Sequence, residues 1–211
     1  MKQLMLILVL LCPSVLQAQQ KALRPRTEPL VGTAFLSGAT LISIRPELHR
    51  YETGLYDAVG LSQVPRQPFD NVLQFVPIGT PIVLGLAGLE GEHSTGEIAL
   101  LSATASLIGL AVVESAKFFY QVERPDGSAM TSFPSGHTFF AFTGADILRR
   151  EYGRRYPWLP YIGYGVAAAV GAMRVYNSRH WPSDVLGGVG VRCSRSVSPI
   201  GYSQNKGTEN H

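Results

Sequence analysis

Residues 133–145 read Phe-Pro-Ser-Gly-His-Thr-Phe-Phe-Ala-Phe-Thr-Gly-Ala. The first residues have the pattern of a helix start, and a charge-free run typical of a helix follows them. Ser135 stands where the N-cap of that helix would stand, and Gly136 lets the backbone approach a ligand closely. Free backbone N–H groups at a helix start bind anions, and His137 would carry a proton beside such an anion. The same residues also suit an ordinary capped helix with an incidental histidine, so this segment alone leaves both interpretations open.

Charge-free stretches recur on both sides of this segment and set the fold class. They are rich in Ala, Leu, Gly and Ser and lack the alternation of strands, which favours helices. These stretches are residues 30–44, 71–89, 98–113, 139–145 and 156–173. A chain of 211 residues with 45% hydrophobic residues is long enough for one domain with a large core. We therefore expect an all-α protein, a single bundle of about five to six helices, with one short amphipathic helix between residues 47 and 69.

The N-terminus has the three-part pattern of a secretory signal peptide. Lys2 precedes an apolar run at residues 4–11, and Ala18 is a small residue before a cleavage point. We expect a signal peptide at residues 1–18, a linker at 19–29, the helical domain at 30–191 and a disordered tail at 192–211. An uncleaved anchor remains the alternative. The pattern predicts an exported protein, periplasmic or associated with the membrane.

Composition excludes several classes of protein. The chain has two cysteines, too few for a disulfide scaffold or a cysteine-rich zinc domain. A net charge of +3 is too mild to indicate nucleic acid as a partner. No His, Asp or Glu group has convincing metal-ligand spacing, so we expect no metal and no other cofactor. His49 and His93 are interpreted as solvated loop residues.

A pair of cations precedes the Pro-Ser-Gly-His segment at residues 134–137. Lys117 and Arg124 are seven residues apart, about two helical turns, so on one helix they would share a face. Two such cations suit a dianionic group. They equally suit a basic helix end that complements the helix dipole.

A third cluster follows at residues 174–184. His180 and Asp184 are four residues apart, so their side chains would meet on a helix. A carboxylate that holds one imidazole nitrogen leaves the other nitrogen free as a nucleophile. Arg174 adds a planar, permanently charged fork for phosphate oxygens. A helix-surface pair, with Pro182 near a helix start, is the alternative.

Together the three clusters resemble the type 2 phosphatidic acid phosphatase superfamily. The pattern is Lys-x6-Arg-Pro, then Pro-Ser-Gly-His, then Arg-x5-His-x3-Asp, and the resemblance runs from about residue 30 to residue 191. This superfamily includes lipid phosphate phosphatases, bacterial nonspecific acid phosphatases and vanadium haloperoxidases. The resemblance implies a phosphate cradle made by Lys117, Arg124, Ser135, Gly136 and Arg174. It further implies that His180 attacks phosphorus to give a phosphohistidine, that Asp184 orients His180, and that His137 protonates the leaving oxygen and then activates water.

The resemblance implies a metal-independent phosphatase of the cell envelope that acts on phosphate monoesters, above all lipid-linked ones. A soluble periplasmic acid phosphatase that takes small phosphomonoesters is the first alternative. A vanadate-dependent haloperoxidase and an inactive remnant are two further alternatives.

The sequence departs from the family pattern at several places. Met173 replaces the small residue that usually precedes Arg174, and Arg179 matches no motif position, so no role is assigned to it. The interval between Pro125 and Pro134 is short for the family. The apolar run at residues 185–191 ends early, so the last helix looks truncated and the core near Asp184 is expected to be underpacked.

Overall fold

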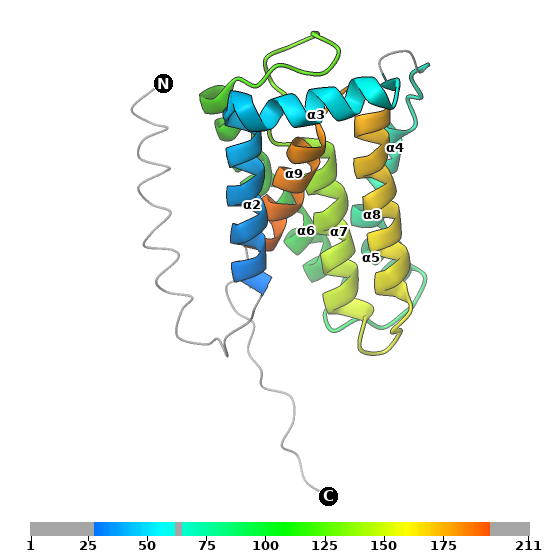
Figure 1. The fold of residues 1–211 in the computed structure, drawn as a ribbon. Coiled ribbons are helices and arrows are strands. Elements are labelled where there is room, and N and C mark those ends of the chain that lie inside the picture. The colour runs from blue at the N-terminus through cyan, green and yellow to red at the C-terminus, as the bar shows by residue number, and fades with distance from the viewer. Residues whose placement is uncertain (1–27, 62–64, 195–211) are drawn as a thin grey trace, which may run out of the picture.

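The computed structural model describes residues 28–61 and 65–194, and within these ranges it contains eight helices and no strand (Figure 1). The all-α prediction is confirmed, with slightly more helices than expected. The predicted signal peptide at 1–18, most of the linker and residues 195–211 lie outside the described residues. The helices are α2 (Glu28–Ile44), α3 (Pro46–Ala58), α4 (Asp70–Leu73), α5 (Val76–Leu86), α6 (Thr95–Tyr120), α7 (Gly136–Tyr152), α8 (Leu159–Tyr176) and α9 (Pro182–Ser194).

The single helix expected at residues 71–89 is two helices, so that prediction is wrong in detail. α4 ends at Leu73, and α5 begins at Val76 with Pro77 in its first turn. Proline lacks an N–H group and fits the first turn of a helix, where no intrahelical acceptor is needed. Pro77 therefore marks a new helix start inside a charge-free run.

α6 is longer at both ends than the apolar run at 98–113. The Ser94 side chain accepts from the Glu97 N–H, and the Glu97 carboxylate accepts from the Ser94 N–H, which makes a capping box at the start. At the other end, Glu114 and Lys117 form an ion pair across 2.7 Å, three residues apart on the same face. The helix continues past its apolar core because these polar residues support it.

α3 is the short amphipathic helix expected before residue 69, and it lies across one end of the bundle (Figure 1). His49 belongs to α3 and contacts the edge of the Trp181 ring, with centroids 4.7 Å apart. His93 lies 2.9 Å from a carboxylate oxygen of Glu151, which is buried. The interpretation of His49 as a loop residue is therefore wrong, whereas His93 does lie in a loop but is paired with a buried carboxylate.

α9 extends to Ser194, three residues into the expected tail. It packs along α2, and a β-carbon at Gly190 would meet the backbone of Leu36. Asp184 is fully buried and Val191 is 2% exposed. The expectation of an underpacked core near Asp184 is wrong, because α2 covers the short last helix.

α7 is the central helix and contacts α5, α6, α8 and α9. Its buried face carries Phe139, Ala141, Ala145 and Leu148. At Gly144 the α5 backbone comes so close that a β-carbon would clash with Ile78. Glycine lets the two helices approach to backbone contact here, which fixes the position of α7 and of the motif at its start.

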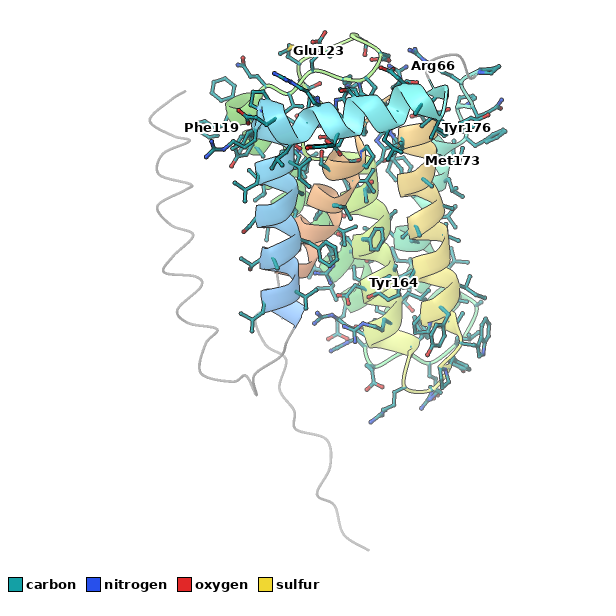
Figure 2. The ribbon with its side chains drawn as sticks, in the orientation of Figure 1. Arg66, Phe119, Glu123, Tyr164, Met173 and Tyr176 are labelled. Atoms are coloured by element: carbon teal, nitrogen blue, oxygen red, sulfur yellow. The ribbon has the colours of Figure 1, made fainter. Side chains whose placement is uncertain are left out.

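α6 is the one helix within the described ranges that is long and apolar enough to cross a bilayer, and 28% of its most apolar window is buried. Leu100, Leu107 and Phe119 are each more than half exposed on it. Figure 2 shows Phe119 pointing outward at the edge of the bundle. Other large apolar side chains on the outside belong to α8, such as Tyr161 and Ile162. Exposed apolar surface of this kind indicates a lipid or protein contact.

A matched pair of glycine substitutions tests the α5–α7 contact. Gly144→Ala should lower the free energy of unfolding by about 1–3 kcal/mol, because the added methyl group meets backbone that cannot rotate away. Gly165→Ala on α8 has open space around its β-carbon and should leave stability unchanged or raise it by up to about 1 kcal/mol. Denaturant unfolding followed by circular dichroism measures both. Equal effects of the two substitutions would contradict the close approach.

Candidate active site

The three motif segments meet at the end of the bundle that α3 crosses (Figure 1). α6 ends there, α7 and α9 begin there, and α8 ends there. Lys117 is in the last turn of α6, and its Nζ would lie 3.8 Å from a β-carbon placed on Gly136. The basic helix end and the Pro-Ser-Gly-His segment are therefore neighbours.

Lys117 and Arg124 do not share a helix face, and that prediction is wrong. α6 ends at Tyr120, and Gln121 takes a left-handed conformation with φ of 47°. Arg124 lies in the following loop, where its N–H donates to the Ala129 carbonyl across 3.0 Å. The turn after α6, and not a continuous helix, brings Lys117 and Arg124 to the same site.

Ser135 is the N-cap of α7, as the sequence predicts. Its hydroxyl oxygen accepts from the N–H of Thr138 across 3.4 Å, and Ser135 itself is fully buried. Its own N–H donates to the Asp184 carbonyl across 2.9 Å. This bond joins the start of α7 to the start of α9.

His180 and Asp184 meet around a helix start and not along a helix. His180 precedes α9, and its Nδ1 lies 3.6 Å from Oδ2 of Asp184 in the first turn. That Oδ2 also accepts from the Trp181 N–H across 2.7 Å and from the Ser132 hydroxyl. An acidic residue in a first turn commonly binds the backbone N–H ahead of the helix. The sequence analysis missed Ser132, which no motif marks.

Burial and charge keep the His180 imidazole neutral. His180 is 2% exposed, and its burial lowers its pKa well below the ordinary value, helped by the positive charges of Arg174, Arg124 and Lys117. These three cations come from separate segments, yet each lies close enough to act on the same ring. Burial also raises the pKa of Asp184 to about 6, against the hydrogen bonds from Ser132 and Trp181.

Arg174 is held by a carboxylate that the sequence analysis missed. Its Nη1 lies 2.6 Å from Oδ2 of Asp70, and both side chains are buried. The Nε atoms of Arg174 and Arg124 are buried and have no hydrogen-bond partner among the described residues. A buried donor without an acceptor costs free energy, so two charged donors of this kind indicate a place for an anion.

His137 faces Asn71 of α4, with 3.1 Å between Nε2 and Oδ1. Burial lowers the pKa of His137 to about 3, helped by the positive charge of Arg174. Asn71 was also missed, because its stretch was interpreted as the start of an ordinary helix.

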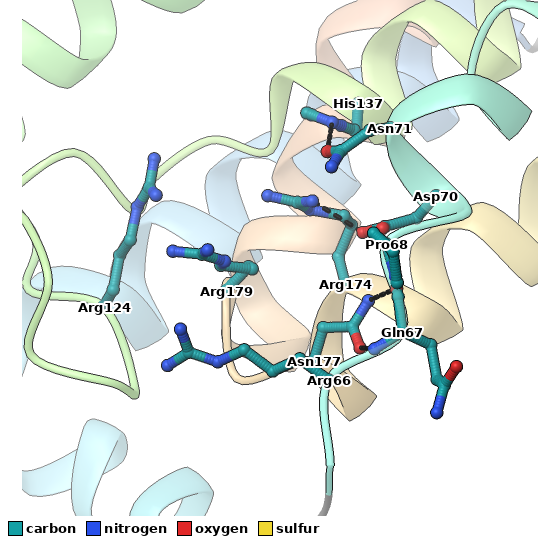
Figure 3. Close-up of a pocket in the computed structure, with 10 residues that line it drawn as sticks. All are labelled: Arg66, Gln67, Pro68, Asp70, Asn71, Arg124, His137, Arg174, Asn177 and Arg179. Atoms are coloured by element: carbon teal, nitrogen blue, oxygen red, sulfur yellow. Dashed lines mark hydrogen bonds and ion pairs between the residues drawn. The ribbon is translucent and has the colours of Figure 1, made fainter.

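A cavity of about 520 Å³ opens beside these residues (Figure 3). Of the predicted site residues, Arg124, His137 and Arg174 line it, whereas His180, Ser135 and Asp184 are buried and do not. The other lining residues are Arg66, Gln67, Pro68, Asp70, Asn71, Asn177 and Arg179. Residues 66–71 thus form a wall of the cavity that no sequence motif indicated.

That wall is tied to the loop that carries His180. The N–H of Gln67 donates to Oδ1 of Asn177 across 2.8 Å, and Nδ2 of Asn177 donates to the Gln67 carbonyl across 2.7 Å. Asn177 is 3% exposed, so this reciprocal pair is shielded from water.

The described residues also bear on metal binding. Within residues 28–61 and 65–194, no three or more His, Cys, Asp or Glu side chains are grouped so that they could hold a metal ion. The donors at the cavity are cationic guanidinium groups, which suit an anion and not a metal.

Comparison with known proteins agrees with the arrangement of the motifs. Residues 98–195 match the model of the PAP2 superfamily. The chain is similar to a lipid A 1-phosphatase of Porphyromonas gingivalis, with 40% identity over 134 residues, 63% of this chain and 30% of that protein. The chain therefore spans less than a third of the length of that relative.

Two solved structures are also similar. One is the first transmembrane PAP2-type phosphatidylglycerolphosphate phosphatase from Bacillus subtilis, 21% identical, with a TM-score of 0.59 over 80% of this chain and 92% of that chain. This likeness shows that the two chains share a fold. The other is Aquifex aeolicus LpxE, 25% identical over 75% of this chain and 91% of that chain, with a TM-score of 0.38, too low to indicate a shared fold.

The charge state of His180 can be measured directly. Because its pKa is lowered, the imidazole should remain neutral at about pH 5.5, where an ordinary imidazole is mostly protonated. Nitrogen-15 shifts of the ring report the charge, and protein unfolded in guanidinium is the control, which should titrate near pH 6.5. Inorganic phosphate should shift the titration of the folded protein upward, because an adjacent anion favours the imidazolium. A midpoint near 6.5 in the folded, phosphate-free protein would contradict the assignment.

Proposed function

We propose that this chain, whose residues 98–195 match the model of the PAP2 superfamily, is a metal-independent phosphatase that hydrolyses phosphate monoesters in the cell envelope. The main observation in its support is that Lys117, Arg124 and Arg174 act on one buried neutral imidazole, His180. Three fixed cations around a potential nucleophile fit a phosphoryl group, whose transfer depends on positioning and charge stabilisation.

The proposed cradle includes two buried guanidinium nitrogens that lack hydrogen-bond partners among the described residues. The Nε atoms of Arg124 and Arg174 would donate to phosphate oxygens, and Lys117 would add its ammonium group. The first N–H groups of α7, at Gly136 and His137, would donate from the positive end of the helix. Ser135 has its hydroxyl engaged with Thr138, so its contribution is to hold this helix start in place.

In the proposed first step, Nε2 of His180 attacks phosphorus while the bond to the alcohol oxygen breaks. The neutral imidazole is the reactive form, and the Asp184 carboxylate beside Nδ1 would stabilise the positive ring that results. The leaving oxygen takes a proton from His137. Burial and the charge of Arg174 lower the pKa of His137, and a phosphate dianion beside it would raise that pKa and supply the acid form.

In the proposed second step, His137 has lost its proton and acts as a base. It takes a proton from water, the water oxygen attacks phosphorus, and the bond from phosphorus to Nε2 of His180 breaks. Inorganic phosphate leaves, and His180 is again neutral. Asn71 would hold the His137 ring in place through both steps.

We also propose a lipid-linked substrate and a site that faces outward from the membrane. The P. gingivalis relative is named for a lipid substrate, and α6 presents an apolar face long enough for a bilayer. Lys117 in the last turn of α6 lies next to Gly136 at the start of α7, so the proposed cradle would be close to where such a helix leaves the lipid. The exported location rests on the signal-peptide pattern at residues 1–18.

Substitution of the two site histidines tests the mechanism. His180→Ala should abolish hydrolysis of an aryl phosphate without added metal, and the parent should form an acid-labile phosphoprotein that this variant does not form. His137→Ala should slow turnover by about 10²–10⁴-fold, the usual loss when a general acid–base is removed. His93→Ala, at the opposite end of α6, is the matched control and should retain activity. Activity like that of the parent in the His180 variant would refute the role of this residue.

Membrane association is tested on the exposed face of α6. The protein should sediment with membranes, resist osmotic shock and high salt, and dissolve in detergent. Leu107 is 68% exposed at the middle of the helix, so Leu107→Lys should shift the protein away from the membrane fraction, whereas Leu107→Phe should not. Release of the parent by osmotic shock would favour the soluble acid phosphatase instead.

A further inference from the structure

Two arginines at the cavity have no part in the proposed cradle. Arg66 precedes α4, and Arg179 lies in the turn between α8 and α9. Both contact one oxygen, Oδ2 of Asp126, across 2.8 Å and 3.2 Å. Asp126 belongs to the loop between α6 and α7, and its side chain is 3% exposed. Three separate segments therefore meet at a single buried carboxylate.

The charges at this place do not cancel. Arg66 and Arg179 share one carboxylate, which leaves one positive charge in excess. Oδ1 of the same carboxylate accepts from the Ser128 N–H across 3.0 Å, so it is occupied within its own loop. Each arginine uses one guanidinium nitrogen for Asp126, and a guanidinium carries five donors in a rigid fork.

The remaining donors are accessible from the cavity. The side chains of Arg66 and Arg179 are 51% and 34% exposed. In Figure 3 their guanidinium groups extend to the same side of the cavity as that of Arg124.

We propose that Arg66 and Arg179 form a second anion-binding subsite, which takes a negatively charged group of the substrate other than the phosphate that is hydrolysed. The proposal deepens the proposed function and rests on it. A cavity of about 520 Å³ has the size of sites that hold a ligand of many atoms, much larger than one phosphate. Paired guanidinium groups bind phosphate or carboxylate oxygens with directed, charge-assisted hydrogen bonds. The preferred substrates are then phosphate esters that carry a second anionic group.

Binding to a variant that cannot turn over tests the subsite without activity. In the His180→Ala background, calorimetry would compare three probes: inorganic phosphate, inorganic pyrophosphate and propane-1,3-diyl bisphosphate. Removal of Arg66 and Arg179 together by alanine substitution should weaken at least one of the two larger probes about tenfold more than phosphate. Selective loss for pyrophosphate places the second anion next to the first, and selective loss for the bisphosphate places it several bonds away.

The control is Arg154→Ala, because Arg154 is 84% exposed and pairs with Glu92 through an N–O distance of 3.1 Å. This variant should bind all three probes like the His180→Ala parent. Equal weakening of all three probes by the double substitution at Arg66 and Arg179, or no weakening of any, would overturn the subsite.

Kinetics separates the subsite from the proposed function. With His180 intact, the double substitution should raise KM for the bisphosphate relative to propyl phosphate and change kcat little, and Arg179→Lys in place of the alanine should restore part of the loss. If both esters lose the same factor, the subsite is wrong and the phosphatase stands. If the parent hydrolyses no phosphate ester, the proposed function is wrong, and the binding measurements still decide whether the subsite exists.

Discussion

The buried carboxyl group of Asp184 is the point on which the site depends. This carboxyl group accepts hydrogen bonds from Ser132 and Trp181 and lies beside His180. The backbone carbonyl of Asp184 accepts from the N–H of Ser135. A fully buried carboxylate is costly unless its surroundings supply such donors. The loop before α7 and the turn before α9 must therefore dock together, and this docking sets the distance between the imidazole and the start of α7.

The cations around His180 place excess positive charge in the site, and carboxylates neutralise this charge only in part. Glu114 pairs with Lys117 and Asp70 pairs with Arg174, whereas no carboxylate of the described residues forms an ion pair with Arg124. Like charges this close repel one another in an interior of low dielectric. An entering phosphate dianion would remove that repulsion and satisfy two buried N–H groups at the same time. Buried positive charges that lack a partner lower the stability of the fold, and the same charges favour the binding of an anion.

Sequence patterns predicted the helices and the N-cap at Ser135, because both depend on near neighbours in the chain. They failed where contacts are distant: Asp70 reaches Arg174 over 104 positions, and His137 reaches Asn71 over 66. They also failed where a helix stops, since the left-handed Gln121 that ends α6 is neither glycine nor asparagine. His180 and Asp184 were predicted to meet and do so, although through a helix start, because Pro182 suits the first position of a helix and is disfavoured in its interior.

α3 crosses the end of the bundle where the candidate site lies, and it is outside the residues that match the family model. From α3, the carboxylate of Glu52 accepts from the Ser183 N–H across 2.7 Å, and the hydroxyl of Tyr56 donates to Ser178. These two bonds hold both sides of the turn that presents His180. A recombinant fragment cut to residues 98–195 would retain every family motif and lose this clamp, together with Asp70 and Asn71. The smallest unit able to keep His180 in place is therefore larger than the region that matches the family model.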